Sequence, residues 1–130
     1  MTVWTAHIAG RVISKKNGRR WVITPKGRRL IPSVAYVAFH RDAAMQLAGF
    51  TPGTPITGPI ELELTVRLAN REHEADLDNQ IVGLADLLQD IGVFRNDRQV
   101  VRIVAEKQYG AASFSADVTV SSVVWDQEAA

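Results

Sequence analysis

Residues 60–68 carry the pattern that most restricts how this chain can fold. Polar residues separate five apolar ones, which are Ile60, Leu62, Leu64, Val66 and Leu68. Side chains of an extended strand point alternately to its two faces, so this segment buries one face and leaves the other in water. It therefore predicts a strand in a sheet that is covered on one side.

The period of the apolar residues changes after residue 76. Apolar side chains now recur at intervals of three and four, at Leu77, Ile81, Leu84, Leu88 and Ile91. This spacing predicts an amphipathic helix of about four turns, from Asp78 to Ile91. Gly92 follows directly and is the residue type that most often ends a helix.

Weaker signals complete the order of elements. Ser33 is a suitable N-cap for a helix that runs to about Ala48. Asn17-Gly18 favours a tight hairpin turn, and Pro25-Lys26-Gly27 turns the chain again. We expect the remaining strands at residues 3–8, 21–24, 99–105 and 114–125. The order β-β-α-β-α-β-β predicts an α+β fold, in which two helices pack on a single mixed sheet.

Composition limits the class of protein. A chain of 130 residues with 46% hydrophobic residues predicts one domain over residues 1–130. The absence of cysteine excludes disulfides and thiolate chemistry. No apolar run has the length of a membrane span, and the first residues do not form a secretion signal. We therefore expect a cytoplasmic protein without a membrane partner.

Charge is distributed unevenly along the chain. Residues 1–41 contain nine basic side chains and no acidic one, whereas all fourteen acids lie in residues 42–130. Clustered Lys and Arg are typical of phosphate binding, so the early segment predicts contact with nucleic acid. The alternative is a solvated basic loop that offsets acids elsewhere in the fold. The candidate DNA-binding residues are Lys15, Lys16, Arg19, Arg20, Lys26, Arg28 and Arg29.

Three aspartates are candidates for a metal site. Asp76 and Asp78 are separated by one residue where a polar linker meets the predicted helix, and in extended backbone they point to the same side. Asp97 follows Gly92 by five residues, at the head of the next strand. Carboxylate oxygens suit Mg²⁺, which can polarise a phosphoryl oxygen and supply hydroxide near neutral pH.

The spacing leaves two questions about these aspartates open. The helix carries the chain away from Asp76, so Asp97 reaches the same point only if the loop at residues 92–96 folds back or a second subunit supplies the acid. Each residue also has an ordinary interpretation, with Asp78 as a helix cap, Asp76 as a solvated loop acid and Asp97 as a turn residue.

The same residues resemble the signature of the RusA-type Holliday junction resolvases. That family has Asp-Leu-Asp-Asn, a helix, a glycine, and then an acid pair before Gln-Val. This chain has Asp76-Leu77-Asp78-Asn79, then Gly92, Asn96-Asp97 and Gln99-Val100. The similarity extends from Asp76 to about Lys107, with a weaker likeness in the basic N-terminal region.

The resemblance implies a single RusA-like endonuclease domain that forms a homodimer. It implies that the dimer binds four-way DNA junctions and nicks two strands with Mg²⁺ or Mn²⁺. It assigns catalysis and metal binding to Asp76, Asp78 and Asp97. Lys107 matches a family lysine and is a further candidate for a DNA contact, although we favour a solvated lysine at a strand end.

Two departures from the family pattern bear on activity. Val82 stands where the family has a catalytic lysine, and Asn96 replaces the first member of its acid pair. The residues before Asp76 are acidic or neutral where the family tends to be basic. Two alternatives stay open, and Val82 favours the first of them. One is a junction-binding protein with weak or lost nuclease activity. The other is an RNA- or protein-binding domain whose acids are helix caps.

Overall fold

The computed structural model describes residues 1–16 and 19–124. Its elements are β1 (Thr2–Ala9), β2 (Arg20–Thr24), β3 (Gly27–Ile31), α1 (Val34–Leu47), β4 (Ile60–Leu68), α2 (Leu77–Asp90), a 3₁₀ turn (Asp97–Gln99), β5 (Val100–Tyr109) and β6 (Ser115–Ser122). The α+β class is confirmed, with one strand more than predicted. The expected turn at Asn17-Gly18 and the end of the last strand at Trp125 lie outside the described residues. Within them, no helix is long and apolar enough to cross a membrane.

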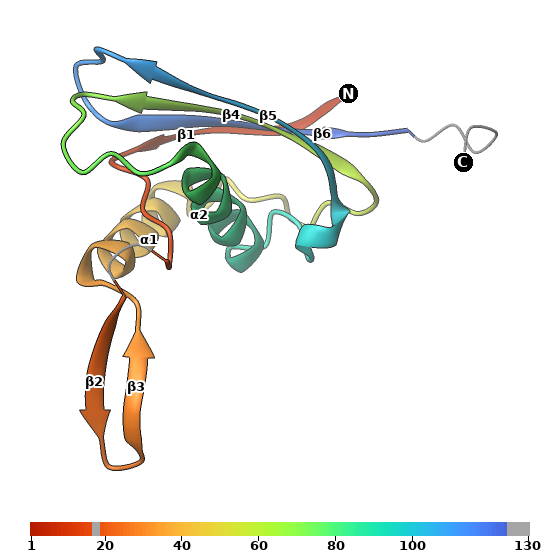
Figure 1. Ribbon diagram of the computed structural model, residues 1–130. Coiled ribbons are helices and arrows are strands. Elements are labelled where there is room, and N and C mark those ends of the chain that lie inside the picture. Colours follow the sequence, from red (N-terminus) through yellow and green to blue (C-terminus); the bar gives the residue numbers. More distant parts are fainter. Residues whose placement is uncertain (17–18, 125–130) are drawn as a thin grey trace.

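Four strands form one mixed sheet in the order β1-β6-β4-β5. The central strand β4 pairs antiparallel with β6 and parallel with β5. Both helices lie on the same face of this sheet (Figure 1). The five apolar residues of β4 point toward them and are all buried, so the predicted one-sided strand is confirmed.

The helix α2 connects β4 to its parallel neighbour β5. Because both strands run in the same direction, the chain must travel back along the sheet before β5 can start. α2 makes this return over 14 residues, which is about 20 Å at the usual rise of an α-helix. The predicted glycine stop is confirmed, since Gly92 follows the helix with a φ of 87°. The start of α2 therefore lies near the end of β4, and its end lies near the start of β5.

Gly83 lets another part of the chain cross α2 at very short range. A Cβ atom at this position would lie 3.0 Å from the carbonyl oxygen of Ile13 and 3.3 Å from the Cα of Ser14. Such contacts leave room for a hydrogen atom only. The crossing fixes the segment after β1 against α2 and so determines where Lys15 and Lys16 lie.

The strands β2 and β3 form a separate hairpin that projects away from the sheet and helices (Figure 1). We call residues 19–31 the arm. The sequence predicted one sheet and only the first of these strands, and this was wrong. β3 was missed because four of its five residues are exposed and it packs against no core, so it lacks the alternation that marked β4. Its partner is β2 alone, with Trp21 opposite Leu30.

A substitution at Gly83 tests the close crossing. We expect Gly83→Val to lower the free energy of unfolding by about 1–3 kcal/mol, because the new methyl groups must displace the backbone at Ile13. Gln89→Val is the control, since it places valine on the same helix away from the crossing and measures helix propensity alone. Urea denaturation of both variants provides the comparison. Equal stability of the two variants would show that residues 13–14 do not pack on α2.

Candidate active site and nucleic-acid interface

Asp76 and Asp78 lie at the start of α2 with their carboxylates in solvent. Asp76 is the N-cap residue in an extended conformation, yet its side chain makes no capping hydrogen bond. Asp78 lies in the first turn, where its Oδ1 accepts a hydrogen bond from the Asn79 N–H at 2.9 Å. The interpretation of Asp78 as the helix cap is therefore wrong. Both carboxylates keep oxygen atoms available next to the positive end of the helix dipole.

Asp97 lies in a short 3₁₀ turn, and the side chains of Asn96 and Gln99 hold this turn in place by hydrogen bonds. The Asn96 side chain accepts a hydrogen bond from the Arg98 N–H at 2.9 Å, which caps the turn. The Gln99 amide donates to the carbonyl oxygen of Ile56 at 2.8 Å and so ties the turn to the preceding loop. The Asn96 side chain is thus engaged as the cap of the turn, while Asp97 itself remains exposed.

The fold separates Asp97 from the other two aspartates within one chain. Asp76 and Asp78 lie at the start of α2, whereas Asp97 precedes β5 near the end of that helix. α2 itself is about 20 Å long at the usual rise of an α-helix, so its two ends lie far apart. Across residues 1–16 and 19–124, no three His, Asp or Glu side chains gather closely enough to hold one metal ion. A loop that folds back to unite the three does not occur.

Charges of both signs surround Asp86 in the second half of α2. Burial raises the pKa of this carboxyl group, Asp90 and Asp97 raise it further, and Lys15 and Lys16 lower it, with a net rise. The two lysines therefore lie along α2, on the side where the chain crosses Gly83. They bring positive charge to a helix in which Val82 supplies none.

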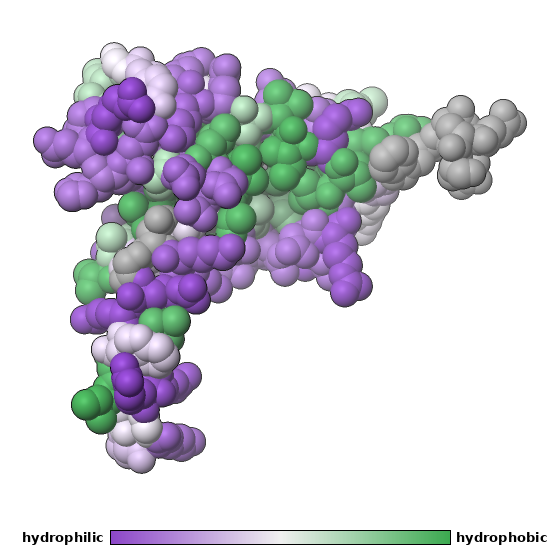
Figure 2. Space-filling model, viewed as in Figure 1, coloured by the Kyte–Doolittle hydropathy of each residue, from purple (hydrophilic) through white to green (hydrophobic). Residues whose placement is uncertain are grey.

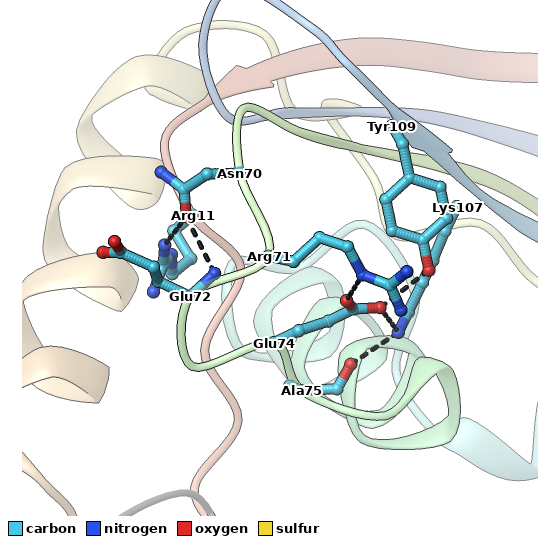
Figure 3. Close-up of polar contacts among 8 residues, drawn as sticks. All are labelled: Arg11, Asn70, Arg71, Glu72, Glu74, Ala75, Lys107 and Tyr109. Carbon is cyan, nitrogen blue, oxygen red and sulfur yellow. Dashed lines mark hydrogen bonds and ion pairs between the residues drawn. The ribbon is translucent and has the colours of Figure 1, made fainter.

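Lys107 is not the solvated lysine that we expected. Its side chain is only 15% exposed. The ammonium group donates to the Glu74 Oε2 atom and to the Ala75 carbonyl oxygen, each at 2.7 Å (Figure 3). Strand β5 is thereby attached to the residue directly before Asp76. Lys107 thus anchors the loop that places this aspartate.

Glu74 is the centre of this anchor. Besides Lys107, it accepts hydrogen bonds from the Tyr109 hydroxyl at 2.7 Å and from the Arg71 guanidinium at 2.8 Å (Figure 3). The hydrogen bonds from Lys107, Tyr109 and Arg71 lower the pKa of Glu74 to about 2. Three donors on one carboxylate hold the loop between β4 and α2 in a single path.

The arm presents a cationic surface with an exposed aromatic ring. It carries no acidic residue, and in Figure 2 it is largely hydrophilic with a few hydrophobic side chains. Trp21 is 59% exposed, and the Arg28 guanidinium lies 4.7 Å from the centre of its ring. The candidate DNA-binding cations that lie on the arm, all of them exposed, are Arg19, Arg20, Lys26, Arg28 and Arg29.

Two polar residues near the aspartates were missed by sequence reasoning. Glu74 has no distinguishing pattern, because two of its three partners, Lys107 and Tyr109, come from a strand more than 30 residues later. Gln80 did leave a signal. It is buried on α2 four residues before Leu84, in line with the apolar residues of that helix, so a polar side chain there interrupts the predicted stripe.

The acid sensitivity of folding tests the role of Glu74. Its pKa is about 2 in the folded protein against an ordinary value of 4.5, so its contribution to stability is present above about pH 4.5 and is lost as the pH falls toward 2. The difference in unfolding free energy between wild type and Glu74→Gln should therefore shrink over this interval. Glu72→Gln provides the reference for removing one acid from the same loop. A difference that stays constant from pH 6 to pH 2.5 would contradict the anchor.

Comparison with known proteins places the chain in a family. None of the curated proteins compared with it matches significantly. The family model described as endodeoxyribonuclease RusA, however, matches residues 10–121. The match includes the arm, both helices, and all three candidate aspartates. The chain belongs to the RusA family of endodeoxyribonucleases, the Holliday junction resolvases.

Proposed function

We propose that this protein is a homodimeric, Mg²⁺-dependent nuclease that resolves four-way DNA junctions in recombination and repair. In this proposal residues 1–130 form one endonuclease domain, which acts in the cytoplasm and also accepts Mn²⁺. The observation that carries the proposal is that, in a chain of this family, Asp76 and Asp78 keep carboxylate oxygens available for a metal ion. Their carboxylates are exposed at a helix start, and that of Asp76 is not used for capping.

We infer that the site is completed by a second copy of the chain. In a two-fold dimer, residue i of one copy meets residue j of the other, and the reverse contact follows by symmetry. If two α2 helices lie antiparallel across such an axis, the end of each helix lies beside the start of its partner. Asp97 of one copy then faces Asp76 and Asp78 of the other. Two equivalent sites result, as paired incision of a symmetric junction requires.

The donor atoms of this composite site fit a hard divalent cation. All three side chains offer only carboxylate oxygens, the ligands that Mg²⁺ prefers. A bound metal would polarise the scissile phosphate and lower the pKa of a coordinated water. The protein's own contribution is placement. The Glu74–Lys107 anchor fixes the backbone before Asp76, and the capped turn at Asn96 fixes Asp97.

A junction-binding protein with weak nuclease activity is the second candidate. Val82 favours it, because valine cannot neutralise charge that develops on the phosphoryl oxygens. Preorganised charge of this kind is typically worth on the order of 10²–10³ in rate. Val82 is half-buried but does not belong to the core cluster. Lys15 and Lys16 lie beside this helix. We propose that they supply the charge that Val82 lacks.

Mixing two inactive variants distinguishes a composite site from a site within one chain. Asp78→Asn and Asp97→Asn should each reduce nicking of a four-way junction to background while junction binding persists, because each removes a metal ligand. In a mixed dimer of the two variants, one composite site carries both substitutions and the other carries none. Mixing should therefore restore about a quarter of the wild-type sites.

The products give a second readout of the same experiment. A mixed dimer with one intact site should nick one strand of the junction and leave the opposite strand whole. Asp76→Asn mixed with Asp78→Asn is the control, since both changes affect the same end of α2 and no intact site can form. Recovery in the control as well, or no recovery in either mixture, would exclude the composite site. Nicking by Asp78→Asn alone at the wild-type rate would exclude the proposed residues.

The salt dependence of binding tests the arm. Replacing Arg20, Lys26 and Arg29 with alanine should weaken junction binding. It should also reduce the slope of log K against log salt by about 0.9 for each phosphate that the arm no longer neutralises. Arg41→Ala on α1 removes an exposed cation outside the arm and should leave the slope nearly unchanged. Filter binding over a range of salt concentrations measures both. An unchanged slope in the triple variant would show that the arm does not touch the DNA backbone.

A further inference from the structure

A cavity of about 480 Å³ opens beside the start of α2. Its walls come from the segment after β1, the start of α1, the end of β4 and the loop that leads into α2. Most of the lining surface is apolar, although polar side chains also contribute to it, as in many ligand pockets. The polar residues of the lining are Arg11, Ser33, Glu72, His73, Glu74 and Gln80. Ala75 belongs to the wall and is the residue directly before Asp76. The cavity therefore adjoins the proposed carboxylate site.

Gln80 lines this cavity, and the oxygen of its buried amide lacks a hydrogen-bond partner among the described residues. The residue is 3% exposed, and its Oε1 atom has no hydrogen-bond partner among the described residues. An amide can turn by half a rotation and exchange its oxygen for its NH₂ group, so it can offer either an acceptor or a donor. Leaving either end unpaired in the interior destabilises the fold. A leucine would continue the apolar face formed by Leu84, Leu87 and Leu88, so packing does not explain the amide.

Two charged side chains that line the cavity, Arg11 and Glu74, are bonded to residues other than Gln80. The Arg11 guanidinium lies 4.1 Å from the centre of the Phe114 ring and donates to the Asn70 Oδ1 atom at 3.4 Å. Glu74 is held by Lys107, Tyr109 and Arg71 (Figure 3). Arg11 and Glu74 thus line the cavity while bonded to these other residues, and the buried amide keeps an oxygen atom without a partner among the described residues.

We propose that the cavity accepts one nucleobase of the DNA, unstacked next to the phosphate that is cut, and that Gln80 hydrogen-bonds to the edge of that base. This inference rests on the proposed function. A base has two apolar faces and a polar edge, which match the apolar surface of the walls and the buried amide of Gln80. Moving a base out of a helix costs unpairing and unstacking energy, and this cost is smallest for a base whose pairing is already disturbed. Since a base with the wrong edge leaves the amide unpaired, the cavity makes the position of the nick depend on sequence.

Gln80→Leu tests this inference through two properties that should change in opposite senses. The variant should melt at a higher temperature than the wild type, because an unpaired buried amide is replaced by an apolar group of similar size. Four junctions are compared that differ only in the base beside the phosphate to be cut. The ratio between the tightest and the weakest binding among them should fall from roughly tenfold in the wild type to within about twofold in the variant. Gln89→Leu makes the same change on the same helix outside the cavity and should leave the preference unaltered.

Binding is measured in the Asp78→Asn background, so that neither measurement depends on cleavage. A lower melting temperature for Gln80→Leu would show that the amide is bonded within the free protein, and the inference would fall. An unchanged base preference would overturn it as well.

A fluorescent base gives an independent readout with the unmodified Gln80. 2-Aminopurine is quenched when stacked and brightens when it leaves the stack. Among the described residues, no Phe, Tyr or Trp side chain lines the cavity, so the probe should brighten on binding when it is placed beside the nick. The same probe one turn away in an arm of the junction should not change. Junction binding and nicking without brightening would remove the base pocket and leave the proposed function intact. If the protein bound and cut duplex DNA as well as it does four-way junctions, both the base pocket and the proposed function would be excluded.

Discussion

Two parallel strands cannot be joined by a tight turn, and this constraint organises the whole molecule. The chain must cross from the end of β4 back to the start of β5, and α2 is that crossing. Its length follows from the length of the strands that it spans. The two ends of α2 are therefore held near opposite ends of these strands. Asp76 lies at the start of the helix, and Asp97 lies after its end. Any chemistry that needs both residues must either break this geometry or use a second copy.

Several residues near the start of α2 give up local stability. The Asp76 side chain leaves its helix uncapped, Gln80 buries an unpaired amide, and His73 adopts a φ of 53° that non-glycine residues rarely take. Proteins retain such features mainly where function requires them. The neighbouring anchor offsets them, since Glu74 accepts hydrogen bonds from the side chains of Lys107, Tyr109 and Arg71. The hydrogen bonds of Glu74 thus stabilise the loop directly before the residues, Asp76 and Gln80, that lower local stability.

Sequence reasoning succeeded where burial imposes a period. The alternation in β4 and the three-and-four spacing in α2 are direct consequences of packing one face, so both elements and the Gly92 stop were predictable. It failed for β3, whose side chains are mostly in solvent and obey no such rule. It also failed for Lys107, because its burial depends on Glu74, which a parallel pairing brings close only after folding. Spacing and resemblance singled out the three aspartates as candidates, and the helix between them left open whether Asp97 returns to Asp76 within one chain. The structure shows that it does not, because the loop at residues 92–96 leads directly into the turn before β5.

The separation of the aspartates has a consequence for how the proposed enzyme would be controlled. If each site takes residues from two copies, a lone chain holds no complete metal site and cannot cut. Dimer formation then supplies both sites at once, so the capacity for one incision never exists without the capacity for the second. A four-way junction cut on one strand only is still branched, whereas symmetric cuts release two duplexes. In the proposed dimer, the crossover that keeps Asp97 away from Asp76 therefore couples assembly of the dimer to the paired cut.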